Sequence, residues 1–529
     1  MTQAGHETEP PDTDWQRLDV RMLAVTPLRQ LFGFLPLIAV VVVVGAQDLD
    51  GRVYGLLFGV LAVVAAGMLR WLTTRYRITG ERIELRSGLL FRTARSVPRD
   101  RIRSVDLTAG PVHRVFGLSV VKIGTGEHAE GSESRELALD AVSAAEADRL
   151  RRLLLRRLDA EGPLSPPDAG AQDGAPGPAP AAGNELAVLN WSWLRYAPLT
   201  VSSLVAVGAV AGAFGQFVGE LGIDPSRVIE LGGVGEQLST TPLLWLGIAV
   251  FALVVLAVAV LGSVLIFVEA WWGFRLVREP GGTLRIHRGL LTTRSVSLEE
   301  RRLRGVEVAE PLLMRIGRGA RVTAVATGLG GGPSQGRGAL LPPAPLDEAH
   351  RVASLVLAEE PSPTRAPLRR HPAVALRRRL VRAVLPVLLG AAVLWLLPRL
   401  GLAPVPAWVG WAVLALLPVT VLLAFDAYHN LGHTLTERYL LTRHGAGVRR
   451  TVTLQRTGVI GWTVSQSLFQ RPAGLVTLSA TTAAGGGAYQ VIDVGTSEGL
   501  GVAEHAVPGL LAPFLQRDDV DAAVAPSAH

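Results

Sequence analysis

Long apolar runs alternate along the chain with shorter stretches in which apolar and polar residues take turns. Six of these runs are about long enough to cross a hydrocarbon core of about 30 Å as helices. They are Leu31 to Ala46, Tyr54 to Leu72, Ala197 to Val218, Leu243 to Val268, Ala383 to Pro398 and Val405 to Phe425. The runs come in pairs joined by shorter polar loops, and the pattern therefore predicts three transmembrane hairpins.

The stretch that follows each pair is an internal repeat. Gly88 to Arg114 aligns without a gap with Gly289 to Arg315 and with Gly445 to Arg471. Apolar and polar residues alternate within it, as around Val105 and Leu107, which is typical of short β-strands. A repeat of this kind indicates one structural unit used several times. We therefore expect three units, each a membrane hairpin followed by a β-rich module.

A helix is expected to close each module. In the first module, Asp140 is predicted to cap a helix whose apolar stripe includes Val142 and Leu150. The second module is predicted to end in a helix near Asp347 to Ala358, and the third in a helix within residues 502–516.

The distribution of charge predicts the orientation in the membrane. Acidic residues such as Asp48, Asp50 and Glu230 fill the hairpin loops, whereas arginines flank the outer ends. The densest group of arginines precedes the third hairpin: Arg369, Arg370, Arg377, Arg378, Arg379 and Arg382. Positive charge is retained on the cytoplasmic side of membranes, so both termini and all three modules are expected in the cytoplasm.

Composition agrees with a membrane protein. Mean hydropathy is +0.33, and only 18% of residues are charged, against about 25% in soluble chains. There is no Cys, which excludes disulfides and thiolate chemistry. The net charge is +7, but Lys122 is the only lysine, and this Arg bias is typical of a GC-rich, for example actinobacterial, genome. We therefore expect no nucleic-acid partner.

These patterns divide the chain into ten segments. The polar N-terminal segment is 1–25 and the C-terminal tail is 517–529. The hairpins are 26–72, 191–272 and 377–430, and the modules are 73–160, 273–360 and 431–516. Residues 161–190 form a Pro/Ala/Gly-rich linker that is expected to be disordered, and residues 361–376 form a basic Pro-rich linker.

The repeat resembles a known family. The residues that carry the resemblance are Arg77-Ile78-Thr79, the Gly88-Leu89-Leu90 turn, Arg95 to Pro98, Arg101 to Val105 and Pro111 to Gly117. They are similar to the membrane-flanked bacterial pleckstrin-homology-like (PH-like) proteins, and specifically to YdbT-like members with three repeated units. The third copy departs from the pattern at Gly458, Ile460 and Trp462.

The resemblance implies the fold class and the setting. We expect an α+β membrane protein with six transmembrane helices in three hairpins. Each hairpin would be followed by a cytoplasmic PH-like β-barrel or sandwich closed by a C-terminal helix. The resemblance further implies multi-pass anchoring in a bacterial inner membrane, binding modules rather than an enzyme, and a role in envelope stress or antimicrobial resistance. The oligomeric state stays open between a homo-oligomer and pairing with a smaller single-domain PH-like membrane protein.

Arginines are the candidate ligand-binding residues. Arg114, Arg315 and Arg471 occupy one register in all three copies, where they either contact a phosphate or a partner carboxylate or tie a loop to its own barrel. Five others belong to basic stretches that either face anionic lipid or are simply solvated: Arg95, Arg101, Arg103, Arg302 and Arg304.

Other chemistry is weakly indicated. Asp426, His429 and His433 would share a helix face, but they lack the central Glu of a zinc-protease motif, and the repeat places His433 at the start of a strand. The Gly-rich run Gly328 to Gly338 lacks the Gly-Lys-Ser/Thr ending of a phosphate loop. We therefore expect no catalytic residue, metal or cofactor.

Two functions remain open from the sequence. The first is a non-enzymatic scaffold that presents three PH-like modules to a protein partner or to anionic phospholipid headgroups. The alternative is a component of a transporter, efflux or channel assembly. The interiors of the six runs contain no Asp, Glu, Lys, Arg or His, which argues against a coupled transporter.

Overall fold

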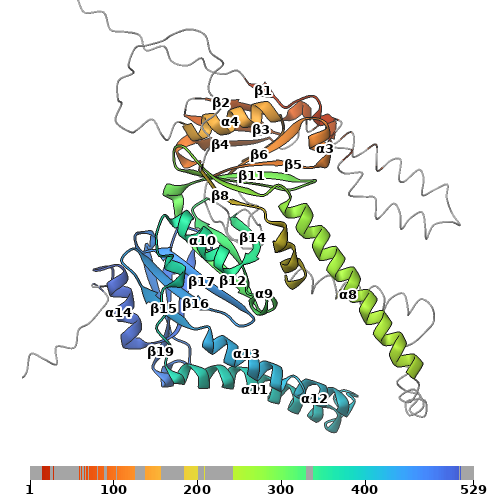
Figure 1. Cartoon of the computed structure of the whole chain (residues 1–529), viewed down its shortest axis with the longest axis vertical. Helices are drawn as coiled ribbons and strands as arrows, with labels where there is room; N and C mark the ends of the chain where they lie inside the picture. The colour runs from red at the N-terminus through yellow and green to blue at the C-terminus, as the bar shows by residue number, and fades with distance from the viewer. Residues whose placement is uncertain are drawn as a thin grey trace, which may run out of the picture. The chain divides into compact units, whose positions relative to one another are not determined.

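The computed structural model describes residues 15–23, 71–79, 81–88, 92–124 apart from 103, 137–156, 184–200, 242–328 and 338–511. It also describes isolated positions between 25 and 69, and at 208, 212 and 513. The backbone packs into two compact units: residues 1–303 with 327–340, and residues 304–326 with 341–529. The division falls inside the second copy of the repeat. Figure 1 traces both units.

The first unit contains two antiparallel sheets. One has the strand order β1-β2-β3-β4, and the other has the order β7-β6-β5-β11-β10-β9-β8. The strands of the four-stranded sheet are β1 (Gln16–Arg17), β2 (Arg75–Ile78), β3 (Arg82–Ser87) and β4 (Thr93–Pro98). Those of the seven-stranded sheet are β5 (Ser104–Ala109), β6 (Leu118–Gly124), β7 (Leu137–Ser143), β8 (Asn184–Val188), β9 (Arg275–Glu279), β10 (Thr283–Arg288) and β11 (Thr293–Glu299).

The second unit also contains two antiparallel sheets. Their strand orders are β14-β13-β12-β17-β16-β15 and β18-β19-β20. The six-stranded sheet consists of β12 (Leu303–Pro311), β13 (Gly319–Ala326), β14 (Ala339–Pro345), β15 (Gly432–Leu435), β16 (Tyr439–His444) and β17 (Val448–Gln455). The three-stranded sheet consists of β18 (Gly461–Ser465), β19 (Leu475–Thr481) and β20 (Ala488–Gly495).

Successive copies of the repeat are joined by strand pairing. Strand β5 of the first copy pairs with β11 of the second, and β12 of the second copy pairs with β17 of the third. Ser104 lies opposite Leu298, and Gly305 lies opposite Leu454. These two pairs occupy equivalent positions of the repeat, so both junctions have the same register. The three modules are predicted as separate domains, and their boundaries stay a prediction. The strand pairing shows that neighbouring copies share sheets.

The first glycine of each repeat has a backbone reason. Gly88, Gly289 and Gly445 adopt φ values of 102°, 112° and 118°, a region that side chains other than Gly rarely enter. Space is also lacking, because a Cβ on Gly445 would lie 2.0 Å from the carbonyl oxygen of Val448. The turn between the second and third strands of each copy therefore depends on glycine.

A helix follows the last strand of each copy, as expected: α4 (Ala144–Arg156), α10 (Leu346–Leu357) and α14 (Thr496–Ala506). Two expectations were wrong in detail. Asp140 lies inside β7, and the Ser143 hydroxyl instead accepts the backbone N–H of Glu146 at 3.2 Å. The third helix begins at Thr496 rather than after residue 502, because β20 already ends at Gly495.

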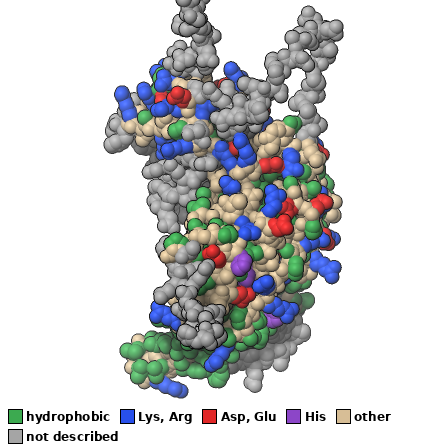
Figure 2. Space-filling view, turned by 90° about the vertical axis from the view of Figure 1, so that its left-hand side faces the viewer, with side chains coloured by type: hydrophobic (Ala, Val, Ile, Leu, Met, Phe, Trp, Pro, Cys, Tyr) green, Lys and Arg blue, Asp and Glu red, His purple; other side chains and the backbone are tan. Residues whose placement is uncertain are grey.

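Among the described residues, three helices are long and apolar enough to span a membrane: Ala252–Trp271, Ala373–Arg399 and Ala407–His429. The first is the apolar part of α8 (Pro242–Trp271), the second is α11 (Ala373–Arg399), and the third comprises α12 (Ala407–Leu414) and α13 (Leu417–His429). Helix α11 starts ten residues before the predicted Ala383. Hydrophobic side chains gather around the hairpin formed by α11, α12 and α13 (Figure 2). The runs 31–46, 54–72 and 197–218 lie largely outside the described residues, as do most of linker 161–190 and most of Gly328 to Gly338. The expectation that the whole linker is disordered was wrong at its end, because Asn184–Val188 form β8 and pair with β9.

The buried core lies between the sheets and the helices that follow them. In the first unit it includes Ile83, Val105, Val121 and Leu139, which pack with Leu150 of α4. In the second unit, Leu440 and Leu454 pack with Val502 of α14. Leu478 and Val494 form an adjoining cluster with Ala503. The alternating apolar positions of the repeat therefore face these cores.

Candidate functional site

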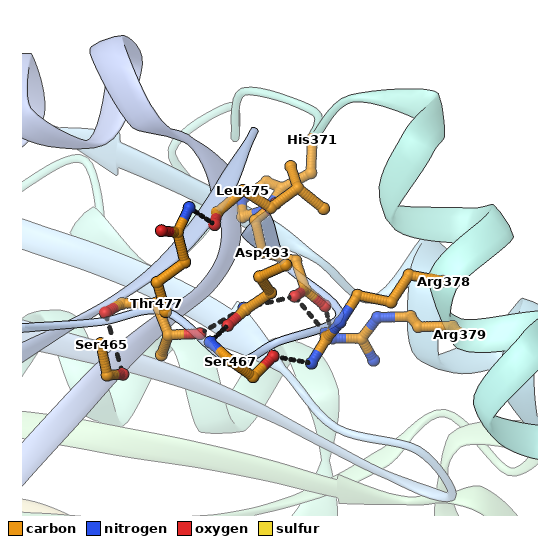
Figure 3. Close-up of polar contacts among 10 residues, drawn as sticks. His371, Arg378, Arg379, Ser465, Ser467, Leu475, Thr477 and Asp493 are labelled. Atoms are coloured by element: carbon orange, nitrogen blue, oxygen red, sulfur yellow. Dashed lines mark hydrogen bonds and ion pairs between the residues drawn. The ribbon is translucent and has the colours of Figure 1, made fainter. Parts of the chain in front are cut away.

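The candidate site lies where α11 begins, against the end of β20. Asp493 is fully buried, and its carboxylate accepts a hydrogen bond from Arg379 Nη2 at 3.0 Å and another from Arg378 Nη1. Gln470 Nε2 donates to the same carboxylate at 2.9 Å. Figure 3 shows both guanidinium groups pointing at Asp493 from α11. Buried carboxylates need such partners, and this one fixes the start of α11 on the third module.

The backbone places Asp493 in this position. Its φ is 62°, and Ala141, three residues before α4 in the first copy, has the same φ. In both copies the pairing shifts register in the last strand pair, between Ser119 and Val121 and between Val476 and Leu478. Asp enters the left-handed region more readily than most residues. The register shift and the left-handed residue therefore occur in both copies, whereas the buried carboxylate is specific to the third copy.

A pair of histidines continues the network behind Asp493. His371 Nδ1 lies 3.1 Å from the carbonyl oxygen of Asp493, and His371 Nε2 lies 3.0 Å from His433 Nδ1. Because a carbonyl only accepts, His371 Nδ1 donates to it, and His433 Nδ1 then donates to His371 Nε2. His433 Nε2 is left without a proton, 3.6 Å from Glu498 Oε1.

Both histidines are held neutral. Burial lowers the pKa of His433 to about 4, with further lowering by His371 and Arg369. Burial also lowers the pKa of His371, although the Asp493 carbonyl opposes the shift. The network is therefore a neutral structural support, and the charge available to a ligand is that of the arginines in front of it.

A groove of about 710 Å³ opens beside this network. Arg377 and Arg382 of α11 line it and are exposed, as is Phe469, whose exposed fraction is 71%. The rest of the lining is Val374, Arg378, Val381, Leu385, Pro386, Ser467, Pro472 and Ala473. Guanidinium groups bind phosphate oxygens, and the apolar wall continues along the candidate membrane helix. The groove therefore suits an amphiphile with an anionic head.

The repeated arginines occupy comparable places in the first two copies. Arg114, on the short helix α3 (Pro111–Val115), donates to the carbonyl of Leu290 in the next copy. Arg315, on α9 (Leu312–Ile316), donates to the carboxylate of Asp426 at the end of α13, and to Asn430 Oδ1 at 3.2 Å. Each therefore contacts the copy that follows rather than its own barrel.

The third repeated arginine differs. Arg471 lies in the turn η7 (Arg471–Ala473), is exposed, and its side chain has no hydrogen-bond or ion-pair partner among the described residues. Its ligand-binding role stays a prediction.

The other predicted arginines have different surroundings. Arg95 lies exposed on β4 and Arg101 exposed on η1 (Arg99–Arg101), while Arg103 is outside the described residues. Arg302 is buried, where it donates to Glu299 Oε2 at 2.8 Å and to the carbonyl of Ile102 at 2.5 Å. Arg304 lies against Gly458. These positions favour a structural role for Arg302 and leave the predicted basic face untested.

Comparison with known proteins agrees with the repeat. The family model described as "Bacterial PH domain" matches residues 25–158, 228–360 and 384–506. The chain belongs to the bacterial PH domain family. It is 25% identical over 449 residues to the UPF0699 transmembrane protein YdbT of Bacillus subtilis (strain 168), which covers 81% of this chain and 84% of that one.

A shorter relative matches one part of the chain. The UPF0699 transmembrane protein YdbS of the same organism is 30% identical over 101 residues, which is 19% of this chain and 59% of that one. No solved structure shows a significant match. The family match and these relatives therefore show a membrane protein in which the bacterial PH domain occurs three times.

The residues considered for a metal in this PH-domain protein have separate partners. Asp426 pairs with Arg315, His429 Nδ1 lies 2.8 Å from the Phe425 carbonyl oxygen, and His433 lies on β15 beside His371. Within the described part of the chain, no group of three His, Asp or Glu residues could hold a metal ion.

Sequence reasoning missed Asp493. The signal was an acidic residue at a position where the first copy has Ala141, in a module that follows a dense group of arginines. Aligning the copies beyond Arg471 would have shown this difference.

Proposed function

We propose that this protein is a non-enzymatic, membrane-anchored binding protein whose third PH-like domain holds the headgroup of an anionic phospholipid. The observation that carries the proposal is the groove in which Arg377 and Arg382 stand above the apolar wall of Val381, Leu385 and Phe469. In this proposal the domains lie on the cytoplasmic side of an inner membrane and act together as a scaffold. In this proposal the protein acts in the response to envelope stress or to antimicrobial compounds.

Charge supports an anionic ligand. Arg377 and Arg382 are exposed and have no hydrogen-bond or ion-pair partner among the described residues. Arg378, in contrast, shares the carboxylate of Asp493 with Arg379. A basic side chain near an anionic membrane surface contributes about 1 kcal/mol, so two of them favour an anionic over a neutral headgroup by a measurable amount.

Position supports a lipid. The arginines lie in the first turns of α11, and the helix continues into an apolar stretch whose residues are largely exposed within the protein. By the positive-inside rule, we expect this end of α11 at the cytoplasmic surface. A phospholipid bound there would keep its phosphate beside the arginines and its acyl chains along Val381 and Leu385.

The test is lipid binding by the full-length protein in detergent. Short-chain phosphatidylglycerol should bind and raise the melting temperature, and short-chain phosphatidylcholine should bind more weakly. The variant R377A/R382A should lose affinity by roughly 10- to 30-fold, as expected from about 1 kcal/mol per arginine. The control R370A/R399A removes the same charge outside the groove and should bind as wild type does. Equal binding of both lipids, or equal loss in both variants, would reject the proposal.

A further inference from the structure

Two sheet edges of this chain correspond to strands that are paired elsewhere in it. Strand β4 ends its sheet and β18 ends its sheet, among the strands that the structure describes. In the repeat, β4 is equivalent to β11 and β17, whereas β18 is equivalent to β5 and β12. Those four strands form the two junctions between copies. The first copy therefore keeps one half of the junction open, and the third copy keeps the other half.

We infer that β18 of one molecule pairs with β4 of a second copy of this chain, and so repeats the internal junction between molecules. Both internal junctions predict one antiparallel register for it. Ser104 opposite Leu298, and Gly305 opposite Leu454, both correspond to Gly461 opposite Val97. The remaining pairs are Trp462 with Ser96, Thr463 with Arg95, Val464 with Ala94, and Ser465 with Thr93.

Side-chain exposure on β18 supports this pairing. Val464 is 45% exposed, whereas its equivalent in the second copy, Val308, is 0% exposed. Ile460, just before the strand, is also exposed. The apolar position that a neighbouring strand covers at the internal junction, Val308, thus has an open equivalent at Val464 of β18.

Strand β4 shows the same difference. Ala94 and Ser96 are exposed. Their equivalents are buried in both junctions: Ser295, Ser297, Thr451 and Thr453. Small residues therefore occupy these places in all three copies, as the close approach of a partner strand requires.

Gly461 supplies an independent argument. At the internal junction, a Cβ on Gly305 would lie 1.9 Å from the carbonyl oxygen of Thr453 on the partner strand, so glycine is needed there. Gly461 is the equivalent residue, yet within its own chain a Cβ would meet only Thr481 Cβ, at 3.9 Å. Nothing within its own chain crowds a Cβ at 461, whereas a strand placed like β17 would crowd it. The β5–β11 junction, in contrast, accommodates Ser104 at the equivalent position.

A second copy fits better than an unrelated partner because one chain carries both halves of the junction. Exposed edges of sheets readily add a strand, and main-chain hydrogen bonds give affinity while alternate side chains set the register. The contact is head-to-tail, since β18 and β4 are different surfaces. It does not depend on lipid binding.

The absence of Cys allows a direct test with the full-length protein in proteoliposomes. One population carries Val464→Cys with one affinity tag, and the other carries Ala94→Cys with a different tag. Residues directly opposite across an antiparallel pair lie within disulfide range, whereas a neighbour one residue along points to the other face. Mild oxidation should give a reducible 464–94 dimer with both tags, roughly tenfold more abundant than the dimer from Thr463→Cys with Ala94→Cys.

Three results would overturn the inference. They are no dimer between differently tagged copies, equal dimer from the matched and shifted pairs, and a crosslink that forms only within a chain carrying both Val464→Cys and Ala94→Cys. Wild-type melting temperatures of the single variants under reducing conditions would show that folding is intact. A further arm adds Gly461→Val, which should reduce the matched crosslink without lowering the melting temperature. An unchanged crosslink in that variant would contradict the predicted strand contact.

Discussion

Arg379 donates to the buried carboxylate of Asp493 at 3.0 Å, although the two residues are separated by most of the third hairpin and most of the third PH-like domain. Arg378 and Gln470 complete the set of donors around the same carboxylate. The start of a candidate membrane helix is thereby fixed to the sheet of a domain. This attachment positions the arginines that line the groove.

Replacing Asp493 with alanine should destabilise this attachment strongly. The change leaves two largely buried guanidinium groups without their carboxylate, which costs about 3–5 kcal/mol when a buried pair is broken. Asp493→Asn keeps an acceptor and a residue that tolerates the left-handed backbone, so this variant should lose less stability than D493A. Melting temperatures of the purified variants would check the order. Equal stability of wild type and D493A would contradict the assigned role.

Acid should weaken the third domain through His433. Its pKa in the folded protein is about 4, against about 6.5 for an unperturbed histidine. The unfolded state therefore binds an extra proton below pH 6.5, and stability should fall as the pH drops from about 6.5 to about 4, by up to about 3 kcal/mol. His433→Gln should flatten this dependence in a series of melting curves, whereas His505→Gln, at an exposed site, should not. If the pH dependence of stability is unchanged in H433Q, groups other than His433 cause it.

The three repeated arginines should respond differently to alanine. Arg114→Ala and Arg315→Ala remove contacts to the following copy and should each cost about 1–3 kcal/mol, because hydrogen bonds of charged groups are lost. Arg471→Ala should change stability by less than about 0.5 kcal/mol, as is usual for exposed positions. The three melting temperatures provide the measurement. Equal loss in all three would indicate that Arg471 has a structural role like the others.

Gly305 and Gly461 occupy one position of the repeat, and alanine should destabilise the protein at Gly305 but not at Gly461. Gly305→Ala places a Cβ against the Thr453 carbonyl and should destabilise the β12–β17 junction by about 1–3 kcal/mol, as overpacking does. Gly461→Ala should leave the melting temperature of the protein close to the wild-type value. If G305A melts as wild type does, the two strands are not in the described register.

Much of the fold could be predicted because it is local and repeated. The alternation around Val105 and Leu107 predicts strands, and the aligned Gly88, Gly289 and Gly445 mark one turn in three copies. The pairing of β5 with β11 could not be predicted in this way. A strand's side-chain pattern shows which face is buried but does not identify its neighbour, and both junctions connect different copies.

The site was predicted less well for the same reason. The arginines near the start of α11 are visible in the sequence, and they were assigned to membrane orientation. Their partner Asp493 lies far along the chain, where only the fold of β20 brings it beneath them. Arg302 was predicted either to face anionic lipid or to be solvated, because it belongs to a basic stretch, but it is buried with Glu299. Sequence alone does not distinguish a solvated arginine from a paired one.

Photocrosslinking from Phe469 in native membranes tests the proposed binding of an anionic phospholipid most directly. Phe469 is replaced by benzoylphenylalanine in the full-length protein, and the adducts formed on irradiation are identified by mass spectrometry. Leu468, which is 74% exposed but does not line the groove, is the control position. We predict adducts of anionic phospholipids at position 469, enriched over their share of the membrane and reduced by R377A/R382A. Adducts that follow lipid abundance, that form equally from position 468, or that contain only protein would contradict the account.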